Sequence, residues 1–412
     1  MPPLLRSRPS LPRPTRSAGV GLLLVVASAT CVGQTGPLSA SERRLWQTSA
    51  TEVAALQRSG LIDNDAALSA YVGAIARRVA PPDGPAPVQV HIVLDPEANA
   101  FALPNGHVYV HAGLLAMLDR EDQLAQVLGH EVAHVTQRHS AARVDRARGI
   151  LSAVQILGVA ASVGFGVGGG AGAGFWNGLA NTGLSLTASL AISGHGRAAE
   201  AEADVLAFGH LQQAGYDVCG APEVFTRLLT RYPDRSGVET FFYGDHPQTS
   251  RRLAAATAAA ERVRNGPCTA APRDSLYAAR TSGVRARLVE LWVRADRPDR
   301  ALADADRFLQ ADSTHAGVWA WRAEAGRALG TDEARGRARE DAHQALALDA
   351  TLAMVHRTLG GLAEDRGDRA GAREAYAAYL AAQPDAPDRR YIRRRLAELA
   401  APPPSSLPPS PH

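Results

Sequence analysis

The stretch "VLGHEVAHVTQRHS", residues 127–140, decides the fold and the chemistry that we expect of this chain. His130 and His134 are four residues apart, and residues with this spacing lie one above the other on a single face of an α-helix. Two imidazoles placed in this way suit a tetrahedral zinc ion. Glu131 points to the open side of such a metal, where its carboxylate would act on a water rather than bind the ion. The stretch therefore predicts zinc-dependent hydrolysis with Glu131 as the general base.

A motif this short also occurs by chance, and the alternative is a solvated helix face that carries two spare histidines. The neighbouring residues favour the metal site. Gly129 and Ala133 are small, and the flanking positions are apolar, so we expect the two histidines to be at least partly buried. Buried histidines need polar partners, which a metal ion supplies.

A third ligand is expected from the stretch "RAAEAEAD", residues 197–204, which opens a second long helix. Glu200 and Asp204 are four residues apart and share a face of that helix, whereas Glu202 points elsewhere and is expected to be solvated. We predict that Glu200 is the third ligand of one Zn²⁺ per chain. Asp204 is predicted to accept a hydrogen bond from the far nitrogen of one of the two ligand histidines.

Three other histidines near these segments are expected to be ordinary surface or strand residues: His107, His111 and His139.

The composition is that of a folded protein with two or three domains, with 412 residues, 46% hydrophobic residues and 21% charged residues. The net charge of +3 is too small to indicate a nucleic-acid partner.

Residues 1–30 have the pattern of a signal peptide: a basic start, an apolar run over residues 18–29 and small residues at its end. We therefore expect an exported, periplasmic protein. The alternative is that the segment is retained as a membrane anchor.

The chain has three cysteines, an odd number for an oxidising compartment. One explanation is that Cys31 becomes a lipidated N-terminus, which would attach the protein to the outer membrane. Cys219 and Cys268 would then be left to pair, but their spacing does not decide whether they do.

The periodicity of the remaining chain predicts several helices around a small sheet. Residues 88–95 alternate as a strand does, and two short strands flank the turn residues 104–106. The helix that carries the histidines is expected to run over residues 119–146. Further helices are expected over residues 41–62, 64–80, 197–215, 221–232 and from about residue 249.

Residues 149–196 contain no Asp, Glu, Lys or Arg, and residues 163–175 are rich in glycine. This segment reads either as a glycine-softened helical hairpin packed on the site or as a flap or membrane-touching patch. A membrane anchor formed by residues 150–176 is a weaker alternative.

From about residue 275 the composition becomes alanine-rich and helical, and three similar segments recur. The interval from Ala350 to Pro384 equals the 34-residue period of tetratricopeptide repeats. We expect an all-α repeat domain over residues 275–400, ending in a capping helix. Residues 401–412 read as a disordered Pro-rich tail.

Four motifs in order, "NAFALPNGHVYVHAGLL", "LGHEVAHVTQRHS", "EAEAD" and "HPQTSRRL", resemble the zinc metallopeptidases of the HtpX, BepA and LoiP type. The likeness covers about residues 40–265, and the repeats behind it look most like BepA. It implies an α+β, mostly helical fold: a zincin-like metallopeptidase domain over residues 38–268 with a small antiparallel sheet, followed by the repeat domain.

The resemblance also implies roles for further residues. Val108, Tyr109, Val110 and His111 would form an edge strand that pairs with the substrate backbone by β-augmentation. His246 would stabilise the oxyanion or occupy the open metal position at rest. Arg252 would brace Glu200 and Asp204 through charge-assisted hydrogen bonds.

Together these observations predict an exported zinc endopeptidase acting on misfolded or stalled envelope proteins. The repeats would dock a client or the outer-membrane assembly machinery, with peripheral contact to the membrane. The alternative is a periplasmic chaperone or assembly scaffold whose metal site is latched or inactive.

Overall fold

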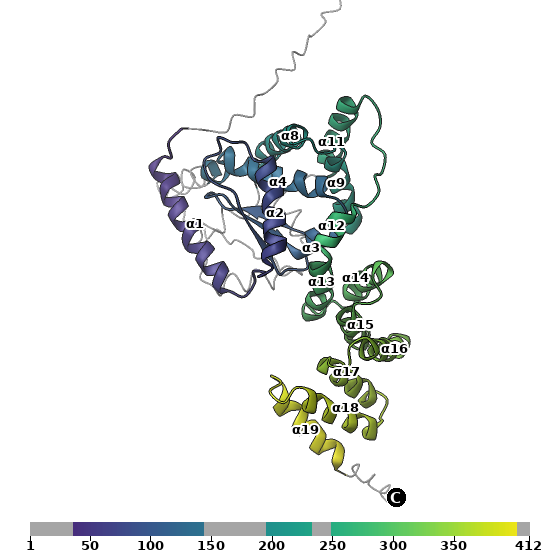
Figure 1. The fold of residues 1–412 in the computed structure, drawn as a ribbon. Coiled ribbons are helices and arrows are strands. Elements are labelled where there is room, and N and C mark those ends of the chain that lie inside the picture. The colour runs from purple at the N-terminus through teal and green to yellow at the C-terminus, as the bar shows by residue number, and fades with distance from the viewer. Residues whose placement is uncertain (1–35, 144–194, 233–248, 402–412) are drawn as a thin grey trace, which may run out of the picture.

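The structure is a computed structural model, which describes residues 36–143, 195–232 and 249–401 (Figure 1). Several predictions lie outside the described residues. These are the signal peptide and Cys31, almost all of the uncharged segment, His246, and the Pro-rich tail beyond Ala401.

In the described residues, the sheet has three strands, β1 (Gln89–Val93), β2 (Ala100–Ala102) and β3 (His107–His111), in the order β1-β3-β2. β2 and β3 pair antiparallel across the predicted turn, where Gly106 has a φ of 89° that suits glycine. β1 pairs with β3 in parallel.

Two sheet predictions are therefore wrong: the sheet is mixed rather than antiparallel, and β3 is its central strand rather than its edge. The physical reason is burial. Val108, Tyr109 and Val110 are all 0% exposed, as expected of a strand covered on both faces and both edges.

The helices around the sheet bury α4 (Glu121–Thr136) at the centre of the domain, where every residue from Asp122 to Thr136 is buried. α4 contacts the helices α2, α8 and α9 and the strands β2 and β3 (Figure 1). The other helices of this part of the chain are α1 (Ala40–Arg58), α2 (Ala66–Val79), α3 (Ala112–Met117), α8 (Arg197–Gln213), α9 (Gly220–Arg231) and α11 (Thr249–Arg264).

α4 ends at Thr136, so the prediction of one continuous helix over residues 119–146 is wrong. Arg138 has a φ of 54°, in the left-handed region, and a new helical stretch starts at His139. The guanidinium of Arg138 forms an ion pair with Glu42 of α1, at 3.2 Å, and donates to the carbonyl of Gly36. The break turns the chain back toward the end of α4.

Cys219 and Cys268 form a disulfide, which answers the question that their spacing left open. The bond joins the start of α9 to the segment that follows α11. It therefore fixes the C-terminal side of α11 to the rest of the domain.

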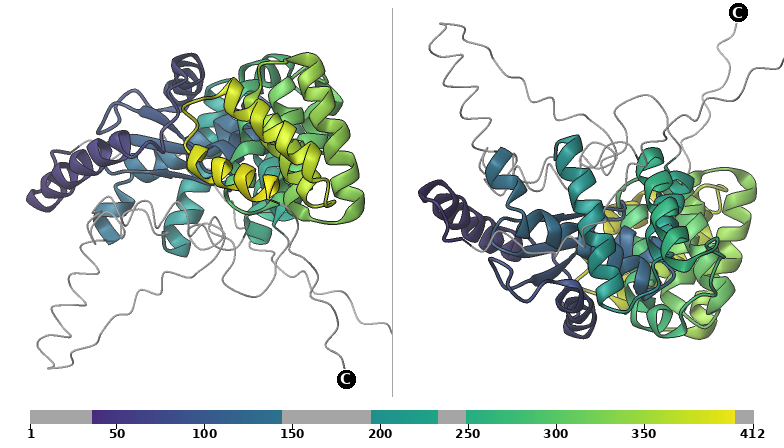
Figure 2. Two further views of the ribbon diagram at one scale, coloured as in Figure 1. Left: turned by 90° about the horizontal axis from the view of Figure 1, so that it is seen from below. Right: turned by 90° about the horizontal axis from the view of Figure 1, so that it is seen from above.

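The remaining helices stack one after another away from the sheet, as Figure 1 shows; Figure 2 views the same array end-on, from below and from above. Consecutive helices pack in pairs, α13 on α14, α15 on α16 and α17 on α18. Their bounds are α12 (Ser275–Arg280), α13 (Ser282–Arg294), α14 (Pro298–Ala311), α15 (Ala316–Leu329), α16 (Asp332–Leu348), α17 (Ala353–Glu364), α18 (Arg369–Ala382) and α19 (Arg389–Ala400).

The first helices of this array share the core of the preceding domain. Tyr277 of α12 and Val284 of α13 belong to the same buried cluster as Leu114 and Leu115 of α3. The Tyr277 hydroxyl donates to the carbonyl of Leu115 at 2.8 Å. Within the described ranges, no helix combines the length and the apolar character needed to cross a membrane.

Candidate metal centre

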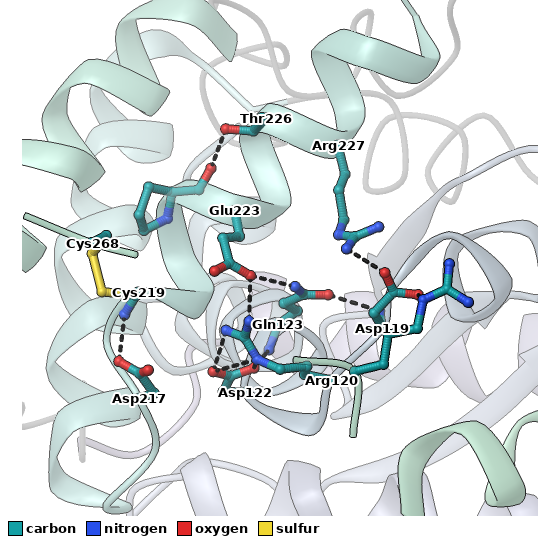
Figure 3. A network of polar contacts seen from close by, with 12 residues as sticks. Asp119, Arg120, Asp122, Gln123, Asp217, Cys219, Glu223, Thr226, Arg227 and Cys268 are labelled. Carbon is teal, nitrogen blue, oxygen red and sulfur yellow. Dashed lines mark hydrogen bonds and ion pairs between the residues drawn. A yellow bond between two sulfur atoms is a disulfide. The ribbon is translucent and has the colours of Figure 1, made fainter. Parts of the chain in front are cut away.

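The start of α4 is held against α9 by a network of charged side chains (Figure 3). Arg120 forms ion pairs with Asp122 and with Glu223 of α9, each at 2.7 Å. The amide of Gln123 donates to Glu223 at 2.6 Å. Asp119 pairs with Arg227, one turn further along α9. These contacts fix the position of the helix that carries the two histidines.

The structure brings His130, His134 and Glu200 together from α4 and α8, with their candidate ligand atoms all within 4.8 Å of one another. The Nε2 atoms of the two histidines are 3.0 Å apart. Oε2 of Glu200 lies 3.4 Å from Nε2 of His130, and Oε1 of the same carboxylate lies 3.4 Å from Nε2 of His134. All three side chains are buried, at 5%, 2% and 2% exposure.

This group fits a zinc ion in ligand type and in spacing. Two ligand atoms about 2.0–2.1 Å from one ion at a tetrahedral angle lie about 3.4 Å apart. The separations of 3.0 and 3.4 Å found here are close to that value. Two imidazoles and one carboxylate also form the ligand set of zinc hydrolases that leave one position open.

Asp204 and Arg252 surround the first histidine. Asp204 Oδ1 lies 3.0 Å from Nδ1 of His130. Arg252 of α11 donates to both carboxylate oxygens of Asp204, at 2.8 and 2.7 Å, and its Nη1 lies 3.3 Å from Glu200. Arg252 therefore contacts both carboxylates, Glu200 and Asp204.

The pKa values show how strongly these charges interact. Burial and Arg252 lower the pKa of His130, but its contacts with Asp204 and Glu200 outweigh both and raise it to about 9. Burial raises the pKa of Asp204, but His130 and Arg252 outweigh it and bring it down to about 2. The pKa of His134 is lowered, first by burial and then by the nearby His195. Without a metal ion, the raised pKa therefore favours a protonated His130, and the lowered pKa keeps Asp204 ionised beside it.

Two residues at the second histidine are not in the predicted site. His139, expected to be an ordinary surface or strand residue, is only 8% exposed, and its Nδ1 lies 2.8 Å from Nδ1 of His134. His195 stacks on the His134 ring with the centroids 3.7 Å apart. Helical spacing could not place His139 here, because α4 ends at Thr136 and Arg138 takes a left-handed conformation. For His195, the sequence carried no signal that we recognise.

The other residues singled out in the sequence lie as follows. Glu131 is 2% exposed and lies on α4 beside the first ligand histidine. His111, at the end of the central strand, lies 3.5 Å from Asp95. His107 contacts His91 of β1 at 2.8 Å. The four residues predicted as a substrate-pairing edge are therefore inside the sheet.

Residues 63–260 match peptidase family M48. The chain contains a peptidase M48 domain. The match begins just before α2 and ends within α11, so it includes the three candidate ligands, Glu131 and Arg252.

Relatives of this M48 domain include bacterial proteases and mitochondrial metalloendopeptidases. The beta-barrel assembly-enhancing protease of Escherichia coli is 29% identical over 274 residues, which are 62% of this chain and 53% of that protein. Its counterpart in Yersinia pestis is 30% identical over 47% of this chain and 38% of that protein. The mitochondrial metalloendopeptidase OMA1 of Schizosaccharomyces pombe is 29% identical over 52% of this chain and 59% of that protein. The alignments thus span roughly two fifths to three fifths of these relatives.

Proposed function

We propose that the protein is a zinc-dependent endopeptidase that hydrolyses peptide bonds of misfolded or stalled envelope proteins. The observation that carries this proposal is the buried group of two imidazoles and one carboxylate, spaced for one tetrahedral ion. A buried group of this kind on the M48 domain has a direct chemical use in peptide hydrolysis.

In the proposed mechanism, His130, His134 and Glu200 would hold the zinc ion. A zinc ion there supplies positive charge that polarises the substrate carbonyl and makes a water acidic. Glu131 takes the proton of that water while the water oxygen bonds to the carbonyl carbon. As the C–N bond breaks, Glu131 gives the proton to the leaving amine. Asp204 accepts from Nδ1 of His130, which would leave Nε2 of that ring with the lone pair that a zinc ligand needs.

His246 has a proposed role as well, although it lies outside the described residues. It belongs to the "HPQTSR" stretch that leads into α11, and Arg252 of the same stretch lies at the candidate metal centre. We propose that His246 either stabilises the oxyanion or blocks the open metal position at rest.

The proposed location is the periplasm. The Cys219–Cys268 disulfide supports it, because disulfides persist mainly in oxidising compartments. The signal-peptide pattern of residues 1–30 and the bacterial relatives named as beta-barrel assembly-enhancing proteases agree with it. Attachment to the outer membrane through a lipidated Cys31 belongs to the same proposal.

The paired helices α13–α18 are proposed to be tetratricopeptide repeats that dock a client or an outer-membrane assembly partner. Their support is the 34-residue period and the stacking of consecutive helix pairs. Stacked pairs form extended concave surfaces suited to protein ligands.

The experiment that tests the peptidase compares the wild type with Glu131→Gln for casein cleavage and zinc content. We expect Glu131→Gln to lower kcat/KM by about 10²–10⁴-fold and to retain one zinc ion per chain, because the base is not a ligand. Glu200→Gln should lose zinc as well as activity. Equal residual activity in the wild type and Glu131→Gln would instead favour a scaffold with an inactive metal site. A full zinc content in Glu200→Gln would mean that the third ligand is another residue.

A further inference from the structure

The second candidate ligand, His134, has a polar neighbour at each ring nitrogen. Its Nε2 faces Glu200 and the first ligand histidine. Its Nδ1 lies 2.8 Å from Nδ1 of His139. The other nitrogen of His139, Nε2, lies 3.4 Å from a carboxylate oxygen of Glu202. A continuous polar path therefore runs from the metal-facing nitrogen to the surface, where the Glu202 side chain is 55% exposed.

Two ring nitrogens at 2.8 Å share one proton, and only two arrangements of neutral rings are possible. If His139 donates, His134 carries its proton on Nε2 and cannot bind a metal through that atom. If His134 donates from Nδ1, its Nε2 keeps a lone pair, and His139 must carry its own proton on Nε2. The position of a single proton thus decides whether the second imidazole is a ligand.

We propose that His139 and Glu202 are positioning residues that hold His134 in the metal-binding tautomer. The inference rests on the proposed function, since it takes the second imidazole to be a zinc ligand. Glu202 accepts from Nε2–H of His139, so Nδ1 of His139 is left as an acceptor for His134. Neither residue touches the metal or the substrate.

The geometry at His130 supports this assignment, because its outer nitrogen also faces a carboxylate of α8. Asp204 accepts from Nδ1 of His130 without an intermediate residue. α8 therefore supplies Glu200 to the centre itself and two further carboxylates, Asp204 and Glu202, to the outer nitrogens of the two histidines, one directly and one through His139. The left-handed residue Arg138 makes the longer path possible, because it turns His139 back onto the end of α4.

The test is a zinc titration of the full chain in competition with a chelator. His139→Leu removes the acceptor and should weaken zinc binding by about 10–100-fold, the usual effect of losing such a partner. His139→Asn should stay within about threefold of the wild type, because its Oδ1 can occupy the place of Nδ1 and accept the same hydrogen bond. Glu202→Leu should weaken binding several-fold, and Glu202→Gln, which keeps an acceptor oxygen, should not.

A matched control is His107→Leu, which removes a second 2.8 Å histidine pair, between His91 and His107 on the sheet. It should bind zinc as the wild type does. Recovery in His139→Asn distinguishes positioning from packing, because Asn does not fill the space of an imidazole. If His139→Leu fails to fold, the two Glu202 variants decide the matter.

The inference is overturned if His139→Leu binds zinc as tightly as the wild type, or if His139→Asn binds as weakly as His139→Leu. Either result would leave the proposed function standing, provided that the wild type binds zinc and His130→Leu does not. A wild-type chain without zinc affinity would overturn the proposed function and this inference together.

Discussion

At the scale of single residues, Arg252 is the side chain on which the candidate centre depends most for charge balance. It is 8% exposed and contacts the carboxylates of Asp204 and Glu200. Arg252→Met would leave the buried carboxylate of Glu200 and the partly buried one of Asp204 without their cation. Breaking a buried ion pair costs about 3–5 kcal/mol, and the partial exposure of Asp204 places the expected loss toward the lower end. Arg252→Lys should recover only part of this, since an ammonium cannot form the two parallel bonds to Asp204.

Chemical unfolding in the presence of a chelator measures this effect without a contribution from bound metal. Arg262→Met, on the exposed part of the same helix, is the control and should change the free energy of unfolding by less than about 0.5 kcal/mol. A loss for Arg252→Met no larger than that of the control would contradict the charge-balance role.

Arg138 gives a second prediction at this scale. Arg138→Gly should be more stable than Arg138→Ala, which is the reverse of their order within a helix. Both substitutions lose the ion pair with Glu42. In a continuous helix, Ala is more stable than Gly by about 1 kcal/mol. In the left-handed conformation found here, with a φ of 54°, Gly should be more stable than Ala by about 1 kcal/mol. Thermal unfolding of the two variants tests whether α4 ends where the structure places its end. An unchanged order, with Ala the more stable, would mean that the helix continues.

These residues also show what sequence could predict and what it could not. The spacing of His130 and His134 predicts that they share one helix face, because helix geometry is local and regular. Glu200 lies on another helix, so its expected place beside them depended on its shared face with Asp204 and on the family resemblance. The break at Arg138 has no glycine or proline to mark it in the sequence, and arginine is an ordinary helix former. The proximity of His139 to the centre follows from that break, and so it could not be predicted either.

At the scale of elements, some features of the sheet could be predicted from the sequence and others could not. The strands and the turn at Gly106 were predicted correctly, because alternation and turn residues are local signals. The parallel pairing of β1 with β3 joins strands that are not consecutive in the chain, so local signals do not predict it. This pairing makes β3 the central strand. The run of Val108, Tyr109 and Val110, without a polar residue, was the available sign of a fully buried strand. Within the described residues, β1 and β2 are the outer strands, and Ile62 already bridges β1 at Val93.

The helix pair α17–α18 packs closely at Gly360. A Cβ added at Gly360 of α17 would lie 2.5 Å from the ring of Tyr376 in α18. We therefore expect Gly360→Ala to destabilise the array by about 1–3 kcal/mol, since a buried ring has little room to move. Gly336→Ala is the matched control: its Cβ would meet nothing within 4 Å, and the helix should gain up to about 1 kcal/mol. Thermal unfolding of the two variants should shift in opposite directions. Equal shifts would argue against the tight contact.

At the scale of the whole molecule, covalent and packed connections tie the candidate centre to distant parts of the chain. The disulfide closes a separation of 49 residues between the start of α9 and the segment after α11, and it thereby limits the motion of the helix that carries Arg252. α3 connects the strands to α4 on one side and contacts α13 on the other. The first helices of the array are therefore part of the framework that supports the centre.

This organisation predicts where the chain can be shortened. A chain that ends at Gly330, the left-handed C-cap of α15, keeps α12 and α13 on the core of the M48 domain and should still fold and bind zinc. A chain that ends at residue 272 exposes the surface now covered by Tyr277, which is 0% exposed, and removes its hydrogen bond to Leu115. Losing a buried aromatic side chain of this kind costs about 3–5 kcal/mol, a large fraction of the stability of a typical domain. Solubility, cooperative unfolding and zinc content of the two shortened chains measure the difference. If the chain ending at residue 272 unfolds as cooperatively as the longer one, α12 and α13 belong to the repeat array alone. The M48 domain would then not need any helix beyond the disulfide for its stability.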